Sequence, residues 1–521
     1  MTQRQRPMRI LFVVNEPGEF VELRRVANDL CRRDGTENFF LFGNPDYALF
    51  GSHSGSCIAK GYPFFKVGSP IRFRKYYQSI DDGYITLSMM DFTNHRRLKV
   101  AQWLLDWARR WLLGARAFLL LLAGLALTAR RLWRMLSRLS WRPETTNPLS
   151  RGVDIALSYD RFSRKIVRLI GPDIMIFGQD HVDCINPFLI HWAKRFRVRT
   201  LIIPFALGTA REICESLWSV PELDVEASLA NRLTAYFFPK WVNYYNGKRM
   251  LRALAYKIFW LELKGISSEH PWLPNWSKVD KIAVESDVMM RYYRYVRFPE
   301  DQLELTGALC DDILYERGQR KKQNKADEPL KILVAWPSNQ FSANRDVDFD
   351  NYEALCKYLG RFLTGLKRRS GANIIAKLHP TIRISTMEWM NLPPYLFDIE
   401  FVRPDTATLV PDCDLFIATV SSTIRWAIAC GKPVVNFDVY RYGYRDFHDA
   451  RGVVTVSEVE EFEAAVNRLV DDRSFFAEIS RRQAACAPEW GRLDGQSGER
   501  IRALIRRLAE EDTGWPAAKA V

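Results

Sequence analysis

The chain alternates between short apolar runs and longer amphipathic stretches. In its first half, runs rich in β-branched and aromatic residues predict buried strands at 10–15, 39–42, 173–178, 200–205 and 280–286. Each run is followed by a polar or glycine-containing loop and, in most cases, by a helical pattern. Apolar runs without polar alternation are typical of parallel strands that are buried on both faces. The pattern therefore predicts a doubly wound α/β domain, with residues 206–278 expected to be mostly helical.

A second α/β domain follows a polar segment. The run at 319–329 has one aliphatic side chain, Ala326, and we place an exposed linker at 318–329. Six further apolar runs predict strands at 331–336, 373–378, 398–402, 414–419, 433–437 and 453–456. We therefore expect an N-terminal Rossmann-like domain over 1–317 and a C-terminal one over 330–521. We expect a cleft between the two domains. Open α/β sheets bind ligands at the carboxyl ends of their strands, so a ligand is expected in this cleft.

One basic segment, 96–145, is inserted into the first domain. Between Leu98 and Arg142 there are nine basic residues against one acidic residue, which is most of the formal net charge of +14, and five of the 16 tryptophans. On a helix, residues 99–113 separate into a Trp- and Leu-rich face and a charged face, a pattern typical of helices at a bilayer interface. The uncharged run at 117–129 is shorter than the ~20 residues of a membrane span.

This segment predicts a protein bound at the cytoplasmic face of the cell membrane, peripheral or monotopic, on an anionic membrane surface. A buried helical hairpin and a single span are the alternatives. Because no recognisable nucleic-acid-binding module accompanies the basic residues, we expect no nucleic acid partner.

The composition excludes several classes of protein. Hydrophobic residues make up 47% of the 521 residues and charged residues 26%, which are ordinary globular values. Wholesale disorder and a polytopic membrane protein are therefore excluded. The nine cysteines include no Cys-x-x-Cys pair, which argues against a zinc ribbon or a secreted disulfide framework and favours a reducing compartment.

Polar residues that could bind a ligand follow two predicted strands of the second domain. Lys377 lies near the end of one strand and His379 lies at its lip. Ser421, Ser422 and Thr423 follow another strand, at a helix start where hydroxyl and N–H groups can hold an anion. A packing role for the histidine and simple helix capping by the serines are alternative interpretations.

Acidic and histidine residues follow the strands of the first domain. Asp180 and His181 come after 173–178, and Glu212 comes after 200–205. These side chains are candidates for a base that deprotonates an acceptor hydroxyl, and surface or capping roles are the alternative. Gly18, in the first strand–helix turn, would let the backbone approach a phosphate or a sugar.

Four motifs of the second half occur together in one order. They are Lys377–Pro380, Ser421-Ser422, Ala427–Val434, and Tyr444 followed by Arg451-Gly452. In this order and spacing, the chain resembles the C-terminal half of bacterial two-Rossmann (GT-B) transferases of the CDP-glycerol glycerophosphotransferase and capsule polysaccharide transferase type. The stretch 305–314 is similar to an element of the UDP-N-acetylglucosamine 2-epimerases. The acidic nucleotide motif of those epimerases is absent.

The resemblance implies a GT-B glycosyltransferase or glycerophosphotransferase. It would move a glycosyl or alditol-phosphate group from a nucleotide-activated donor to a lipid-linked or polysaccharide acceptor, with 1–317 as acceptor domain and 330–521 as donor domain. The donor is a substrate, and we expect no cofactor and no metal. An epimerase-like enzyme and an inactive GT-B scaffold in envelope assembly are the alternatives. The implied catalytic residues are His379, Asp180, His181 and Glu212, and the implied phosphate-binding residues are Lys377, Ser421, Ser422, Thr423 and Gly18.

Overall fold

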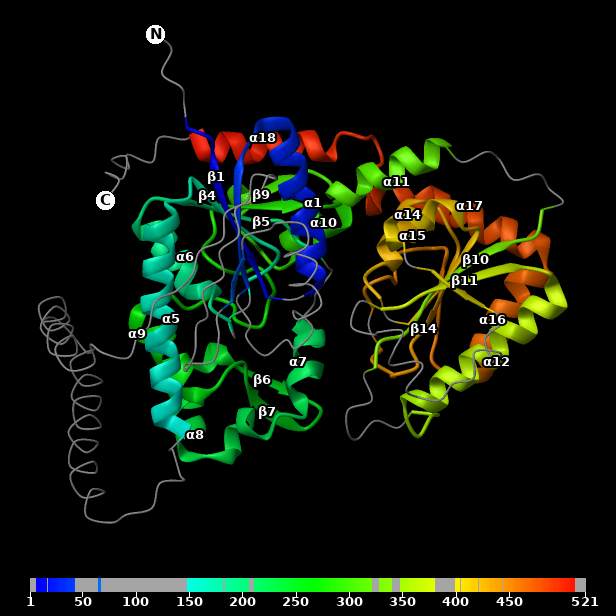
Figure 1. Cartoon of the computed structure of the whole chain (residues 1–521). Helices are drawn as coiled ribbons and strands as arrows, with labels where there is room; N and C mark the ends of the chain where they lie inside the picture. The colour runs from blue at the N-terminus through cyan, green and yellow to red at the C-terminus, as the bar shows by residue number, and fades with distance from the viewer. Residues whose placement is uncertain are drawn as a thin grey trace, which may run out of the picture.

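The computed structural model describes most of the chain outside the basic segment. The described residues are 6–15, 17–42, 64–66, 148–180, 182, 184–205, 210–320, 328–339, 347–379, 399–402, 404–419, 421–443 and 445–510. They form two α/β domains, the N-terminal one blue to green and the C-terminal one mainly yellow to orange (Figure 1).

A seven-stranded parallel sheet forms the centre of the N-terminal domain, in the order β3-β2-β1-β4-β5-β8-β9. All residues of β4 and all but the first of β1 are buried, which explains their uniformly apolar sequences. The strands are β1 (Arg9–Val14), β2 (Glu37–Phe42), β3 (Phe64–Lys66), β4 (Ile174–Phe177), β5 (Arg199–Ile202), β8 (Lys281–Val284) and β9 (Leu303–Leu305).

Helices cover both faces of this sheet. One face packs against α1 and the C-terminal helix α18, and the other packs against α5, α6 and α10. Beyond the sheet, α7, α8 and α9 lie with the hairpin β6–β7 (Figure 1). The helices of this part are α1 (Pro17–Asp34), α5 (Pro148–Ile170), α6 (Asn186–Arg195), α7 (Ala210–Trp218), α8 (Leu229–Phe237), α9 (Ala255–Lys264) and α10 (Asp287–Tyr295).

The C-terminal domain has a six-stranded parallel sheet in the order β12-β11-β10-β13-β14-β15. Its strands are β10 (Lys331–Ala335), β11 (Asn373–Lys377), β12 (Glu400–Phe401), β13 (Leu415–Ala418), β14 (Val434–Phe437) and β15 (Val453–Val456). All six lie where the apolar runs predict them. The helices from here on are α11 (Leu309–Arg320), α12 (Tyr352–Ser370), α14 (Thr406–Leu409), α15 (Ile424–Ala429), α16 (Val459–Asp471), α17 (Arg473–Trp490) and α18 (Ser497–Glu510).

The ends of α12 show how local sequence sets the helix bounds. The Asn351 side chain accepts a hydrogen bond from the Ala354 backbone N–H and so caps the first turn. Gly371 ends the helix with φ 69°, a left-handed conformation that glycine adopts without a steric penalty.

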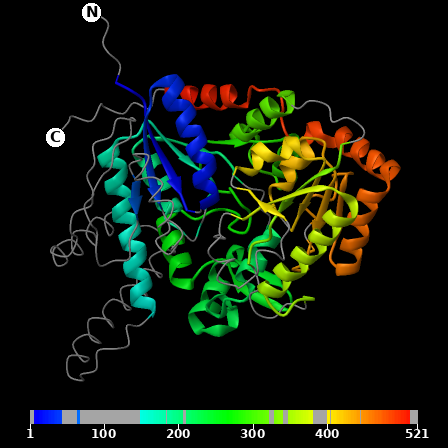
Figure 2. The ribbon, with the colours of Figure 1, turned by 45° about the vertical axis from the view of Figure 1, so that its right-hand side comes forward.

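The predicted extent of the C-terminal domain, 330–521, is wrong at its end. Helix α18 returns to the N-terminal domain and lies beside α1 (Figure 2). Its apolar face, with Leu504 and Ile505, belongs to the same core as Phe12 of β1, because the sheet face is otherwise only partly covered. Arg502 and Arg506 pair with Asp29 and Asp34 of α1.

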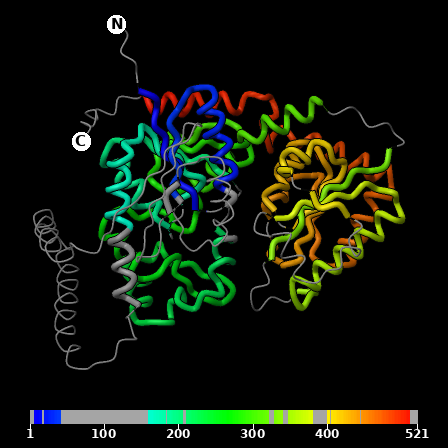
Figure 3. Tube along the Cα trace, viewed as in Figure 1, coloured from blue at the N-terminus to red at the C-terminus, as the bar shows by residue number. Residues whose placement is uncertain are grey.

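The predicted N-terminal boundary at 317 also needs correction. Cys310 and Leu314 of α11 pack into a core cluster of the C-terminal domain with Phe416 of β13. The chain thus crosses to the second domain with α11 and crosses back between α17 and α18 (Figure 3). The linker predicted at 318–329 begins inside α11, and its residues 321–327 lie outside the described residues.

Residues 206–278, expected to be mostly helical, contain the antiparallel hairpin of β6 (Val242–Tyr245) and β7 (Lys248–Leu251). The turn is Asn246-Gly247, with φ values of 43° and 77°. Two consecutive positive φ angles are what a tight type I′ hairpin turn requires, and Asn-Gly is its preferred sequence. The hairpin signal was therefore present in the sequence.

The basic insertion at 96–145 lies outside the described residues, as does His181. Within the part of the chain that the structure describes, no helix is long and apolar enough to span a bilayer.

Truncating the apolar face of α18 should destabilise the N-terminal domain. We expect Leu504→Ala or Ile505→Ala to lower the free energy of unfolding by about 2–5 kcal/mol, because each leaves a cavity in the core beside β1. Urea denaturation followed by tryptophan fluorescence measures this change. Arg507→Ala, on the exposed face of the same helix, is the control and should cost about 1 kcal/mol or less. Equal effects of the core and control variants would contradict this packing.

Candidate active site

The C-terminal sheet brings the two predicted ligand-binding stretches to one edge. Lys377 is the last residue of β11, and β10 lies between β11 and β13. The three strands are parallel, so the residues that follow β11 and β13 emerge at the same edge. The order of the strands reverses between β10 and β13, and open α/β sheets bind ligands at such a switch point. Lys377, His379 and Ser421–Thr423 therefore share one binding edge.

Ser421, Ser422 and Thr423 form the turn that leads into α15. The hydroxyl oxygens of Ser421 and Thr423 lie 2.8 Å apart, and the Thr423 backbone N–H donates to the Ser421 hydroxyl at 3.3 Å. Ser421 thus closes a local turn before α15, and among the described residues the helix itself has no side-chain cap. Ser422 is exposed and borders a pocket between the domains. The adjacent serines therefore differ in their surroundings, and Ser422 is the more accessible to a ligand.

His379 and Lys377 are partly buried at the end of β11. Burial lowers the pKa of His379 to about 4, so its imidazole is neutral at pH 7. Burial also lowers the pKa of Lys377, against the attraction of the Asp405 carboxylate. A neutral imidazole can donate one hydrogen bond to a phosphate oxygen, and an approaching anion raises its pKa. His379 therefore fits a hydrogen-bonding role better than that of a permanent cation.

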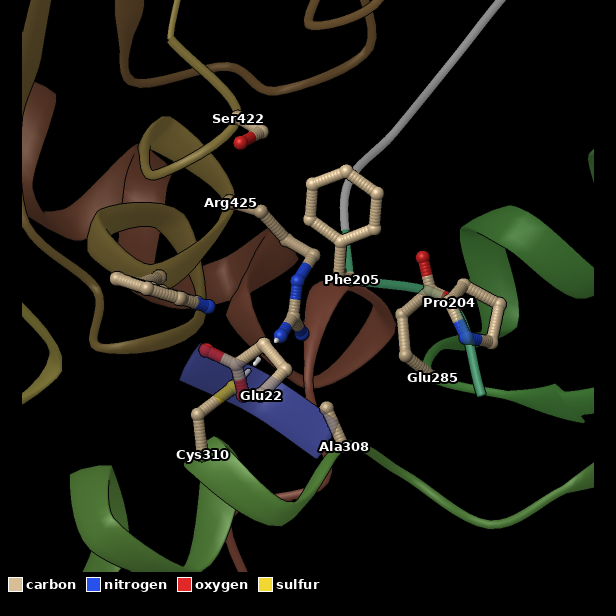
Figure 4. Close-up of a pocket in the computed structure, with 9 residues that line it drawn as sticks. Glu22, Pro204, Phe205, Glu285, Ala308, Cys310, Ser422 and Arg425 are labelled. Carbon is tan, nitrogen blue, oxygen red and sulfur yellow. Dashed lines mark hydrogen bonds between the residues drawn. The ribbon is translucent and has the colours of Figure 1, made fainter. Parts of the chain in front are cut away.

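A pocket lies where the two domains meet, and we call it the interdomain pocket. It is lined by Glu22, Pro204, Phe205, Glu285, Ala308, Cys310, Ser422, Arg425 and Trp426. Five of these follow β5, β8 and β9 of the first sheet, and three follow β13 of the second. Figure 4 shows Arg425 reaching from α15 into this group, with Glu22 and Glu285 beyond its guanidinium. The carboxyl ends of both sheets thus face the same pocket.

A buried carboxylate holds the guanidinium of Arg425. Its two terminal nitrogens each lie 3.1 Å from Asp311 Oδ1, and Nη1 also donates to the Trp490 carbonyl at 3.0 Å. Arg425 is 5% exposed and Asp311 is 0% exposed. The other oxygen of Asp311 accepts the backbone N–H groups of Ala308 and Arg492. The pair therefore fixes the start of α11 relative to α15.

Two acidic residues of the pocket were missing from the sequence-based candidates. Glu285 directly follows β8 and is 4% exposed, and Glu22 lies in α1, where it pairs with Arg25. Burial raises the pKa of Glu285 to about 7, and burial also raises the pKa of Glu22. A signal for Glu285 was present, since an acid directly follows a buried strand and precedes Ser286, which caps α10. Glu22 is inside a helix, where no sequence pattern marks it.

The candidates predicted in the first domain are not among the residues that line this pocket. The Asp180 carboxylate accepts the Asn275 backbone N–H at 2.6 Å, and Asp180 borders a second cavity of about 190 Å³ in the N-terminal domain. Glu212 lies in α7, and Gly18 lies in the first turn of α1. His181 is outside the described residues. Their roles in a reaction stay predictions.

No family model matches the chain, and no curated protein matches it. Among solved structures, it is similar to the UDP-GlcNAc 2-epimerase from Neisseria meningitidis bound to UDP-GlcNAc, with 11% identity, 96% of this chain and 100% of that chain covered, and a TM-score of 0.46. For the glycosyltransferase of kitacinnamycin, the identity is 12%, the coverage 97% and 100%, and the TM-score 0.49. For the wall teichoic acid polymerase TagF, the identity is 14%, the alignment covers 45% of this chain and 59% of that chain, and the TM-score is 0.32.

The class of fold is established by the chain's own features: two parallel sheets with Rossmann-like strand order and a pocket between their carboxyl edges. The chain thus has the predicted two-domain GT-B architecture. Its function has to be argued from the site.

Breaking the Arg425–Asp311 pair should be costly. We expect Arg425→Met to lower the free energy of unfolding by about 3–5 kcal/mol, because it leaves a buried carboxylate without its cation. Urea denaturation measures the loss. Arg291→Met is the matched control, since Arg291 also forms an ion pair, with Glu489, but both of these side chains are 53% exposed. That control should cost about 1 kcal/mol or less. Similar losses in both variants would contradict a special role for the buried pair.

Proposed function

We propose that this protein is a metal-independent transferase that moves a glycosyl or alditol-phosphate group from a nucleotide-activated donor. The acceptor would be a lipid-linked molecule or a growing surface polysaccharide. The observation that carries this proposal is the shared edge of Lys377, His379 and Ser421–Thr423 at the switch point of the C-terminal sheet. Hydroxyl, imidazole and ammonium donors at such an edge suit the phosphates of a nucleotide.

The chemistry asked of these residues is electrostatic. As the bond to the leaving phosphate breaks, negative charge grows on its oxygens, and fixed hydrogen-bond donors stabilise that charge without reorganisation. Ser422 borders the interdomain pocket, so it can reach a phosphate that extends toward the first domain. His379, neutral at pH 7 because burial lowers its pKa to about 4, would donate a hydrogen bond and take up a proton as charge develops. The acceptor would approach from the N-terminal domain.

The membrane part of the proposal rests on the sequence of the basic insertion. Its excess of Lys and Arg favours an anionic surface, and its Trp- and Leu-rich helical face favours the bilayer interface. The insertion lies between β3 and α5, so it interrupts the acceptor domain and not the donor domain. An enzyme held at the cytoplasmic face of the membrane in this way would meet lipid-linked acceptors directly.

Removing the phosphate-binding side chains should weaken donor binding. For His379→Ala, and for Ser421→Ala combined with Ser422→Ala, we expect the dissociation constant of a nucleoside diphosphate to rise about tenfold or more per lost contact. Isothermal titration with CDP, UDP, GDP and dTDP measures it. His448→Ala is the control, because His448 is an exposed histidine of the same domain.

Unchanged nucleotide affinity in both variants would refute the phosphate-binding assignment. Interconversion of UDP-N-acetylglucosamine in the absence of an acceptor would instead favour the epimerase alternative. If none of the nucleotides binds the wild-type protein, the inactive scaffold is favoured.

Deleting residues 96–145 should release the protein from membranes. We expect the full chain to sediment with vesicles that contain phosphatidylglycerol, less so at high salt, because the excess positive charge of the insertion is screened. The deletion variant should stay in the supernatant and still bind the nucleotide. Vesicles of phosphatidylcholine alone are the control for charge. A full-length chain that remains in the supernatant at low salt would refute the membrane proposal.

A further inference from the structure

Glu285 differs from the other buried carboxylates at the junction of the domains. Asp311 and Asp312 are each engaged by backbone N–H groups, and Asp311 also by Arg425. Glu285 is 4% exposed, and within the described residues its Oε2 atom has no hydrogen-bond partner. It lines the interdomain pocket on the side of the first domain, whereas Ser422 lines it on the side of the second. The protein thus keeps a buried carboxyl oxygen unbonded at the point where the two sheets meet.

The nearby cation does not satisfy this oxygen. The terminal nitrogens of Arg425 donate to Asp311, to the Trp490 carbonyl and to the Cys310 sulfur. Arg425 therefore acts on Glu285 only through its charge, which opposes the larger effect of burial; the result is a pKa raised to about 7. The carboxyl group of Glu285 also has a backbone hydrogen bond, which lowers its pKa, whereas the charge of Asp311 raises it. A buried carboxylate with one oxygen left without a partner destabilises a fold, and a purely structural role does not explain it. A carboxyl group that gains and loses its proton near neutral pH is suited to proton transfer.

We propose that Glu285 is the general base of the group transfer, acting on a hydroxyl that a neutral sugar or alditol acceptor presents at the interdomain pocket. This inference rests on the proposed function. The acceptor oxygen forms the new bond to the anomeric carbon or to the phosphorus of the donor, while its proton moves to Glu285 Oε2. The bond from that centre to the leaving phosphate oxygen breaks, and its electron pair leaves with the nucleotide. Glu285 then returns the proton to water.

The position of Glu285 fits this role better than the positions of the residues predicted from the sequence. Asp180 is committed to the Asn275 backbone and borders a different cavity. Glu22 lies in the pocket but is paired with Arg25. Pro204 and Phe205 line the same pocket as Glu285 and give it an apolar side.

The test compares the full-length wild type with Glu285→Gln and Glu285→Asp. The readout is release of nucleotide from CDP-glycerol or UDP-N-acetylglucosamine with water as the acceptor hydroxyl. We expect Glu285→Gln to bind nucleoside diphosphates as the wild type does, and to lower turnover by roughly 10²–10⁴-fold. The wild-type kcat/KM should rise with pH through about 7, because the base must be deprotonated. The rise should vanish in Glu285→Gln and return, with a shifted midpoint, in Glu285→Asp.

A second measurement does not depend on turnover. The folded-state pKa of Glu285 lies above its usual value of 4.5, so its ionisation opposes folding increasingly as the pH rises from about 4.5 to above 7. Glu285→Gln should therefore raise the melting temperature relative to wild type at pH 8 and much less at pH 5. Glu304→Gln, at a carboxylate paired with Arg507 on the surface, is the control and should leave turnover and its pH profile unchanged.

The outcomes separate the two proposals. If the wild type binds nucleotides and releases them from a donor, but Glu285→Gln turns over equally fast with the same pH profile, the role of Glu285 is refuted and the proposed function stands. If the wild type neither binds nucleotides nor acts on any donor, the proposed function itself fails. If the melting temperatures of Glu285→Gln and wild type differ by the same amount at pH 5 and at pH 8, Glu285 does not titrate near neutrality. That result would also refute its role as the base.

Discussion

The structure depends on one buried ion pair, Arg425 with Asp311, which holds the crossover helix α11 against the C-terminal domain beside the interdomain pocket. The oxygens of Asp311 accept hydrogen bonds from the guanidinium and from two backbone N–H groups. Arg425 also donates a hydrogen bond to the carbonyl of Trp490 at the end of α17. Breaking a pair of this kind is far more costly than its net contribution to stability, because each partner would be left as an unpaired buried charge. The pair therefore specifies one arrangement of α11, α15 and the end of α17, and with it the position of Ser422 opposite Glu285.

The neighbouring residue, Asp312, extends this arrangement to the end of the chain. Its two oxygens accept the backbone N–H groups of Ser497 and Gly498, and so cap the start of α18. The helix then completes the core of the N-terminal domain. Contacts between the domains also include ion pairs that are partly accessible to solvent, such as Arg25–Asp405 and Arg291–Glu489. An exposed pair such as Arg291–Glu489 adds little to stability, so it contributes less than the buried pair to holding this arrangement.

Much of this fold could be predicted from the sequence because the strands are buried on both faces. The runs that contain β1, β4, β10 and β13 are continuous apolar segments, and their alternation with helical patterns leaves few other architectures. The short strand β9 and the domain to which α18 belongs were missed. The sequence of an amphipathic helix shows that one face is buried but not against which sheet. Only the tertiary structure shows that α18 packs on the N-terminal sheet.

The same limit applies to the site. The shared position of His379 and Ser421–Thr423 could be predicted, because strand ends are visible in a sequence and parallel strands bring them to one edge. The partners Asp311 and Arg425 are 114 residues apart, and no local pattern links them. Arg425 is the one arginine among the residues that line the interdomain pocket, and both of its terminal nitrogens already donate to Asp311. Its guanidinium is therefore not available to bind a phosphate with two parallel hydrogen bonds. Among the described residues of this edge, the proposed phosphate donors are hydroxyl groups, Lys377 and an imidazole that is neutral until the ligand arrives. Donor binding at this edge should therefore be accompanied by proton uptake, in contrast to sites built on arginine, whose charge does not change with pH.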